Sequence, residues 1–393
     1  MISKHFVRAI AGLCLLALVG CATNSHQKTA PATAAPATAV RPKPPPVPEK
    51  DKVLWQYRNA LTDMRHGNFA EAKSNLDAAI ARISNIMGKD ESARKSRSYF
   101  EAEAKKTFIG EPYERVMAYY YRGILYWIDG ELDNARACFR SAQLEDSDTK
   151  EKKYSSDYVL LDYLDGLATL KLSGDGSDQL KRATEEAKIS APPPYNPKAN
   201  LMFFVDFGSG PTKYAVGRYN ELLMFRHTPS PARVVQVQID GQTYHVRPYD
   251  DLYFQATTRG GRVMDHILAN KANFKEGTDV GGNAALITGG VLATTGNRDA
   301  QYAGLGLLAA GLISKIVSAS TVPAADTRFW DNLPLYLGFA ALELPPGLHT
   351  ATIDFLDEQN RKLSGYTKTV HFEIPQGKDQ VIYISDRSTS TSS

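Results

Sequence analysis

The histidines and carboxylates are the side chains that acid–base or metal chemistry would use, but their spacing supports neither kind of site. Asp265 and His266 form the first pair to consider for acid–base work. Adjacent positions point to different sides of a helix, and no nucleophile accompanies the pair, so its predicted role is structural. The other histidines lack the short spacings of zinc ligands. Those after residue 50 are His66, His227, His245, His349 and His371. We therefore expect no metal, no cofactor and no catalytic residue.

Neither of two glycine-rich stretches supports a catalytic or cofactor-binding motif. Gly304-Leu-Gly306-Leu-Leu-Ala309 fits a dinucleotide-binding fingerprint, but no strand precedes it and its flanks belong to one apolar stretch. Gly208-Ser209-Gly210 is followed by a proline and is typical of a loop rather than of a nucleophile elbow. The charges are nearly balanced, with 46 basic and 43 acidic residues. Nucleic-acid binding calls for a concentrated basic patch, so no nucleic-acid partner is expected.

Cys21 has the clearest predicted chemistry. A basic start and an apolar run from residue 9 to residue 19 precede it, and Leu18-Val19-Gly20 leads directly into it. This order resembles the lipobox of bacterial lipoproteins, and all four positions of that pattern match. The resemblance implies a signal peptide over 1–20, cleavage before Cys21 and acylation of its sulfur and its new amino group. Two or more acyl chains give a stable hold on a lipid bilayer.

Alternatives to this anchor are an ordinary signal peptide with an incidental cysteine, or an uncleaved segment. Ala22 stands where many inner-membrane lipoproteins have aspartate, so the resemblance favours the outer membrane. Both faces of that membrane stay open, with the periplasmic face preferred. Cys138 is then the remaining free cysteine, so no intramolecular disulfide is expected.

Proline-rich stretches mark the expected boundaries. Residues 21–50 form a tether rich in alanine and proline, which favours extended polyproline II and a reach of roughly 60–90 Å. Consecutive prolines from Pro192 to Pro194 end the helical part, because proline removes a backbone donor. The predicted organisation is a helical domain over 51–191, a β-rich domain over 195–386 and a disordered tail over 387–393.

Small and aromatic residues recur within the helical domain. The clearer copy lies between Met117 and Ala142, and the earlier copy matches it at Gly67 and Ala72. The pattern resembles the tetratricopeptide repeat, in which small residues let two antiparallel helices approach and aromatic residues fill between them. A third hairpin is expected from Tyr158 to Ala187, and about three hairpins are needed for stability. In the clearer copy the matching residues are Gly123, Tyr126, Gly130, Ala135, Phe139 and Ala142.

The repeat resemblance implies a concave groove that binds peptides or partner proteins. Tyr119, Tyr120 and Tyr121 are consecutive, so they cannot all face one core, and at least one is expected to be exposed. We therefore take the three tyrosines as candidate contacts for an envelope protein partner. The alternative is that these helices simply pack on the second domain.

Strand signals dominate the β-rich domain. Asp240-Gly241 is suited to a type I′ turn between two strands, and Leu344 to Thr350 is similar to a turn of small Ig-like surface modules. The fold class predicted is α+β, with tetratricopeptide-like hairpins followed by a sandwich-like β domain whose last strands form a meander. Strands are expected over 201–207, 234–239, 242–246, 335–344, 349–356, 366–374 and 380–385.

Residues 281–320 interrupt these strands with two apolar halves rich in glycine and alanine. Each half is shorter than the roughly 20 residues of a membrane-spanning helix. A packed helical hairpin covering the sheet is therefore expected. Insertion into a membrane or a partner is the alternative.

The order of elements resembles a group of uncharacterised proteobacterial tetratricopeptide lipoproteins, which we associate with lipoproteins of curli-export type. Thr257–His266, Phe274–Asp279 and Ala325–Pro334 carry this resemblance. It implies a fold and no activity. The predicted function is a membrane-anchored, non-catalytic adaptor or scaffold. The alternative is a cell-wall or carbohydrate-active enzyme, or a glycan-binding protein of the envelope.

Overall fold

Helices come first along the chain and most strands follow, so the α+β class is confirmed. The computed structural model describes residues 46–87, 106–147, 154–155, 157–258 and 324–389. The chain divides into Met1–Pro46 and Val47–Ser393, and every described helix and strand belongs to the second unit.

Six of the described helices form three hairpins after the short 3₁₀ helix η1 (Glu49–Asp51). They are α1 (Lys52–His66) with α2 (Phe69–Met87), α4 (Pro112–Ile128) with α5 (Leu132–Asp146), and α6 (Val159–Lys171) with α7 (Ser177–Glu185). The third predicted hairpin is thus confirmed as a pair of helices.

All three hairpins turn in the same way. A residue with positive φ follows each first helix: Gly67 at 78°, Gly130 at 77° and Ser173 at 63°. The next backbone N–H then donates to the carbonyl five residues earlier, at 2.8–2.9 Å. These bonds are Asn68 to Asp63, Glu131 to Tyr126, and Gly174 to Thr169. Left-handed backbone of this kind satisfies the last helical carbonyls and favours glycine.

The three first helices also share a buried sequence pattern. Aligned on their turns, each has valine, then tyrosine four residues later, then a small residue three further on. The three sets are Val53, Tyr57 and Ala60; Val116, Tyr120 and Gly123; and Val159, Tyr163 and Gly166. The small residue is required where helices meet closely. A Cβ on Gly123 would lie only 2.6 Å from Cε1 of Phe139 on α5.

Three sheets follow in the described part of the chain. One four-stranded sheet has the order β10-β1-β7-β6, another has the order β5-β4-β8-β9, and β2 pairs with β3 in a separate ribbon. β10 runs parallel to β1, whereas the other pairs of strands are antiparallel. A short helix, α8 (Leu252–Thr257), follows β6. The strands are β1 (Leu201–Phe207), β2 (Thr212–Val216), β3 (Leu222–Arg226), β4 (Val234–Ile239), β5 (Gln242–Val246), β6 (Pro248–Asp251), β7 (Tyr336–Leu342), β8 (Gly347–Leu356), β9 (Lys368–Ile374) and β10 (Gln380–Ser385).

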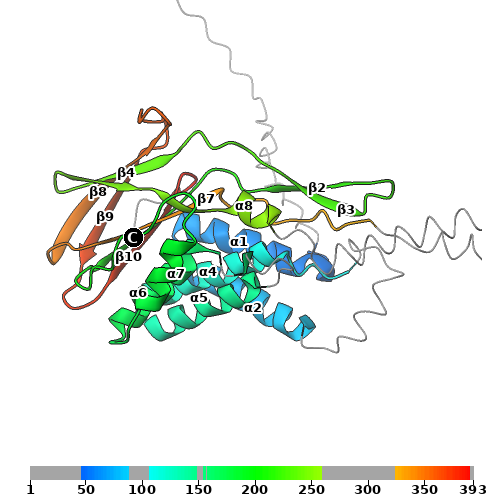
Figure 1. The fold of residues 1–393 in the computed structure, drawn as a ribbon, viewed down its shortest axis with the longest axis horizontal. Helices are drawn as coiled ribbons and strands as arrows, with labels where there is room; N and C mark the ends of the chain where they lie inside the picture. Colours follow the sequence, from blue (N-terminus) through cyan, green and yellow to red (C-terminus); the bar gives the residue numbers. More distant parts are fainter. Residues whose placement is uncertain (1–45, 88–105, 148–153, 156, 259–323, 390–393) are drawn as a thin grey trace, which may run out of the picture. The chain divides into compact units, whose positions relative to one another are not determined.

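Strand β1 lies between two hydrophobic cores, and all seven of its residues are buried. Met202 and Phe204 belong to the core shared with the helices, whereas Phe203 and Val205 belong to the core shared with β4, β8 and β9. Side chains alternate across a strand, so one apolar run serves both faces. Figure 1 shows the helical hairpins gathered on one side of the strands. The helical core therefore continues across the change from helices to strands near residue 195.

Two expectations about the C-terminal part were wrong in detail. The last four predicted strands exist, but they do not form a meander, because β7 and β10 flank β1 while β8 and β9 pair in the other sheet. The predicted tail also begins too early. Ser388 is buried, and Thr389 donates a backbone hydrogen bond of 3.1 Å to the carbonyl of Arg65. The turn at Asp240 and Gly241 is as predicted, with φ of 51° and 79°.

Several predictions lie outside the described residues. They concern the 1–20 signal peptide, Cys21, the Asp265–His266 pair, the 281–320 hairpin, the 304–309 motif, residues 390–393, and most of the 257–266 and all of the 274–279 stretches. Among the helices that are described, none has the length and apolar character to cross a membrane.

Candidate functional site

The inner faces of the three first helices are covered by the chain's own strands and the segment that leads into β7. Each equivalent tyrosine contacts an aromatic ring on the strand side of the core, with centroid distances of 4.4, 6.3 and 6.0 Å. The pairs are Tyr57 with Trp330, Tyr120 with Phe204, and Tyr163 with Phe339. The helical face that would bind a ligand in a tetratricopeptide groove is thus occupied by other parts of this chain.

This arrangement corrects the prediction for the tyrosine cluster. Tyr120 and Tyr121 are 1% and 0% exposed, so neither is available to a partner. Tyr119 is only half-buried. Strands of the sheet pack against one side of α4, and α2 and α5 pack against other sides. Each of the three consecutive tyrosines is therefore at least partly buried, although they point in different directions.

The remaining predicted residues serve mainly the close approach of paired helices. Ala72, Ala135, Phe139 and Ala142 are fully buried, as their predicted packing role requires. Tyr126 differs, because it is half-exposed and lies under the guanidinium of Arg122, 3.5 Å from the centroid of its ring. Its ring still packs against the hydrophobic core of the helices, so Tyr126 is a partly buried residue at the edge of that core.

Asp206 anchors α4 to the sheet. Its carboxylate accepts hydrogen bonds from the hydroxyl of Tyr121 at 2.6 Å and of Tyr383 at 3.0 Å. Burial raises the pKa of Asp206 to about 7, although these bonds and the nearby Arg65 act in the opposite direction. A carboxyl with such a pKa could exchange protons near neutral pH.

The pocket next to Asp206 is too small for a substrate. The adjoining pocket, lined in part by Met64, Arg65, Tyr383 and Ser388, has a volume of about 10 Å³. That is about the space one water molecule requires, far below a substrate pocket of several hundred Å³. The geometry of Asp206 therefore suits a structural anchor better than an acid–base catalyst.

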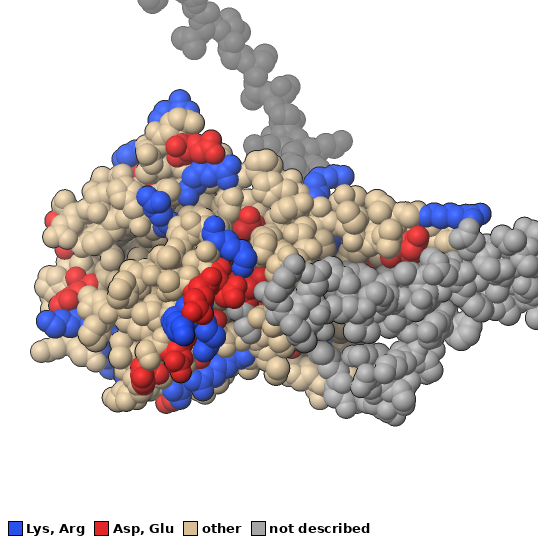
Figure 2. All heavy atoms as spheres, viewed as in Figure 1, with Lys and Arg blue, Asp and Glu red and all other residues tan. Residues whose placement is uncertain are grey.

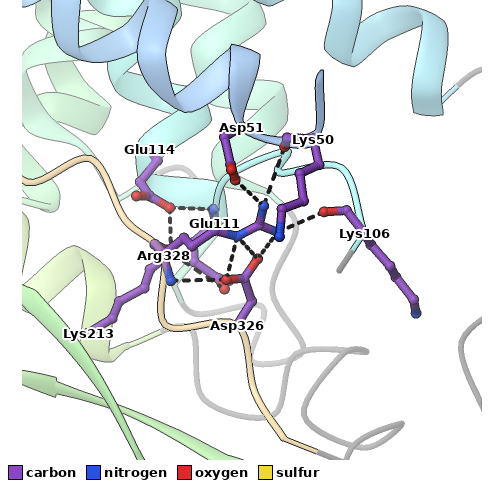
Figure 3. A network of polar contacts seen from close by, with 8 residues as sticks. All are labelled: Lys50, Asp51, Lys106, Glu111, Glu114, Lys213, Asp326 and Arg328. Atoms are coloured by element: carbon purple, nitrogen blue, oxygen red, sulfur yellow. Dashed lines mark hydrogen bonds and ion pairs between the residues drawn. The ribbon is translucent and has the colours of Figure 1, made fainter. Parts of the chain in front are cut away.

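A second anchor joins α4 to the β2–β3 ribbon. The ammonium of Lys213 lies 2.6 Å from Glu114, and the two side chains are 2% and 0% exposed (Figure 3). Glu114 also accepts a 2.6 Å hydrogen bond from the backbone N–H of Trp330. Burial raises the pKa of Glu114 and lowers that of Lys213, while their mutual attraction opposes both shifts.

The segment before β7 extends this network. Arg328 lies 2.6 Å from both Asp326 and Asp51, and it donates to the backbone carbonyl of Lys106 at 2.9 Å (Figure 3). Arg58 of α1 in turn lies 2.8 Å from Asp331. The Ala325–Pro334 stretch, noted in the sequence for its resemblance, thus connects the starts of α1 and α4 to the sheet.

Two further carboxylates, those of Asp250 and Asp379, also join helices to the β-rich part of the chain. Asp250 of β6 accepts 2.9 Å hydrogen bonds from the backbone N–H groups of Val159 and Leu160, so it caps the start of α6. Burial raises its pKa to about 7. Asp379 accepts from the indole of Trp127 at 3.0 Å and from Lys171 at 2.8 Å.

The described histidines show no shared site. His349 lies 2.5 Å from Asp240 and 2.8 Å from the carbonyl of Pro345, so it braces the turn it was predicted to occupy. His66 contacts the carbonyl of Thr62 within its own helix. Across the described ranges, no three His, Cys, Asp or Glu side chains are placed to hold a metal ion.

Sequence reasoning missed the anchors Glu114, Asp206, Lys213 and Asp250. A signal existed for Asp206, because it interrupts the apolar run Leu201–Phe207. A carboxylate inside such a strand must find partners when buried. No comparable pattern marks the other three. Comparison with known proteins found no matching family model, curated protein or solved structure.

Proposed function

We propose that this chain is an outer-membrane lipoprotein, anchored through Cys21, that acts as a non-catalytic adaptor for a protein of the cell envelope. In this proposal the three hairpins are tetratricopeptide-like. Their shared turn, their repeated Val-Tyr-small pattern and the tight contact of Gly123 with Phe139 support that assignment. The complete lipobox-like sequence ending at Cys21 supports the anchor.

The side of α4 next to α2, where Tyr119 and Tyr126 are partly exposed beside the buried Arg122, is the surface we propose for the partner. Tyr119, Arg122 and Tyr126 lie three to four residues apart, so they share one helix face, which we call the α4 seam. Arg122 pairs with Asp77 of α2 at 2.6 Å and covers the ring of Tyr126. Tyrosine and arginine dominate the binding energy of many protein interfaces, and here each is held in place by a neighbour.

The main support for this partner surface is that the inner faces of the helices are already in contact with strands. Because strands already occupy the inner faces of α1, α4 and α6, a partner is expected on the outer side. The ionisable groups Asp206, Glu114, Lys213 and Asp250 are engaged within the protein, which favours a binding role over catalysis.

Site-specific crosslinking in living cells tests the α4 seam. A photo-crosslinking amino acid at position 119 or 126 is expected to capture a specific envelope protein. The same probe at Leu348 is the matched control, because Leu348 is 85% exposed but lies on β8, outside the seam. It measures the nonspecific crosslinking expected of any exposed position. If the seam probes captured no more than the Leu348 probe, the seam would not be the contact.

A variant experiment separates binding from folding. Replacing both Tyr119 and Tyr126 with alanine should weaken crosslinking from a third seam position while unfolding stays cooperative. Tyr120 is unsuitable for this purpose, because its ring is buried and truncating it would damage the core.

A further inference from the structure

The β2–β3 ribbon carries an apolar outer face that the adaptor proposal leaves unexplained. In this antiparallel ribbon Val216 pairs with Leu222, and Tyr214 pairs with Met224, so these four side chains lie on one face. Val216, Leu222 and Met224 are 38%, 44% and 43% exposed. We call this surface the ribbon face.

Contacts on the opposite side hold the ribbon in position. Lys213 forms the buried ion pair with Glu114, and Phe225 packs edge-on against Tyr113 at a centroid distance of 5.8 Å. Near the turn, the carbonyl of Asn220 accepts a 2.8 Å hydrogen bond from the backbone N–H of Ala325. A two-stranded ribbon is only marginally stable alone, so these contacts fix which side faces outward.

Arginines border the ribbon face. Arg226 lies across from Thr212 on the same face, with its guanidinium 5.3 Å from the ring centroid of Tyr214. Arg218 is exposed at the turn. Glu221 also lies at the turn, where its carboxylate accepts a hydrogen bond from the backbone N–H of Tyr219. Figure 2 shows basic side chains at the far end of the ribbon, with an acidic group close by and a largely uncharged surface next to them.

We propose that the ribbon face lies on an anionic phospholipid surface. Aliphatic side chains flanked by tyrosine and arginine match the boundary between headgroups and acyl chains, where tyrosine keeps a wet hydroxyl and arginine meets phosphate. The positive border complements anionic lipid. This inference rests on the proposed anchor only for the nearness of a bilayer.

Vesicle binding by an unacylated protein tests the inference. The chain without residues 1–20 and with Cys21→Ser is mixed with vesicles of phosphatidylcholine alone or with phosphatidylglycerol, and bound protein is measured by flotation. Binding is expected to the anionic vesicles only. The double variant Leu222→Ser/Met224→Ser should bind about tenfold more weakly or worse. Arg218→Ala and Arg226→Ala should each weaken binding about fivefold.

Leu144→Ser is the matched control, because Leu144 is 73% exposed on α5, away from the ribbon, and its replacement should leave binding unchanged. Equal binding to both kinds of vesicle, or unchanged binding of the double variant, overturns the inference. So does a dimer that the double variant abolishes, since the ribbon face would then bind a second copy. Because no acyl chain is present, these outcomes are independent of whether Cys21 is lipidated or the α4 seam binds protein.

Discussion

Tyr121 donates a 2.6 Å hydrogen bond to Asp206, which joins α4 to the first strand of the sheet across 85 positions of sequence. Its neighbour Tyr120 is equally buried, yet the Tyr120 hydroxyl has no hydrogen-bond partner among the described residues. Two adjacent tyrosines therefore stabilise the same helix by different means. Tyr121 does so through a polar anchor, and Tyr120 through its ring.

This difference predicts that removing one hydroxyl group lowers stability at Tyr121 but hardly changes it at Tyr120. Tyr121→Phe should lower the free energy of unfolding by about 1–2 kcal/mol, because Asp206 loses one of its two tyrosine donors. Tyr120→Phe should change it by less than about 0.5 kcal/mol, since no bond is lost. Urea unfolding of both variants measures the contrast. Equal losses would show that the Tyr121 bond contributes nothing specific.

Asp206 also predicts a dependence of stability on pH. Its pKa is raised from 3.8 to about 7 in the folded protein, so the folded state holds this proton more tightly than the unfolded state. The stability it contributes is fully present below pH 4 and is lost as pH rises through about 7. The slope approaches about 1.4 kcal/mol per pH unit within that window.

Comparison with Asp206→Asn isolates this contribution, because asparagine keeps the shape and does not titrate. Between pH 5 and pH 8, the wild type should lose more unfolding free energy than the variant. Asp250, whose pKa is also raised to about 7, is present in both proteins and cancels in the difference. Parallel pH profiles would mean that Asp206 does not titrate in this range.

The Lys213–Glu114 pair predicts a strongly non-additive double mutant. Lys213→Met leaves the buried carboxylate of Glu114 without its cation and should cost about 3–5 kcal/mol. Adding Glu114→Gln removes the uncompensated charge and should recover part of that loss. Unfolding free energies of the two single variants and the double variant give the coupling. Additive losses would show that the pair has no net interaction.

Gly123→Ala should destabilise the protein even though alanine has the higher helix propensity. Alanine is favoured over glycine in a helix by about 1 kcal/mol. However, the new methyl would lie 2.6–3.0 Å from three ring atoms of the fully buried Phe139. Overpacking costs about 1–3 kcal/mol, so Gly123→Ala should be destabilising.

A second substitution checks the cause of that loss. Gly123→Ala should cost less in a Phe139→Leu background than in the wild type, because leucine leaves space for the methyl group. If the cost were the same in both backgrounds, the contact with Phe139 would not explain it.

Local features of this fold were accessible from the sequence, whereas long-range features were not. The hairpin turn at Gly130 and the turn at Asp240-Gly241 follow from backbone preferences of neighbouring residues, and the structure confirms both. The pairing of β10 with β1 joins residues about 180 positions apart and runs parallel. Alternation of apolar residues predicts that β10 is a strand but not which strand it joins.

The tyrosine cluster shows the same limit at the candidate site. Helical geometry predicts that Tyr119, Tyr120 and Tyr121 point to different sides, and they do. It does not predict that Tyr120 and Tyr121 both pack against strands of the sheet. When the three hairpin sequences are aligned on their turns, Tyr57, Tyr120 and Tyr163 occupy the same position. This repetition in the sequence indicates that the three tyrosines lie on the same inner face of the helices.

The proposed membrane anchor gives the last prediction. Cys21→Ser removes the sulfur that would carry diacylglycerol, and the lipobox-like order before it implies that cleavage depends on this modification. The variant should therefore shift from the membrane fraction to the soluble fraction, or accumulate with its signal peptide uncleaved. Metabolic labelling with a fatty acid should mark the wild type and leave the variant unlabelled. Ala22→Asp, which keeps the cysteine, is the control and should stay labelled while moving toward the inner membrane. A Cys21→Ser protein that was cleaved and still bound membranes to the wild-type extent would show that acyl chains are not the anchor. That result would make the ribbon face, tested on its own with vesicles, the next surface to examine.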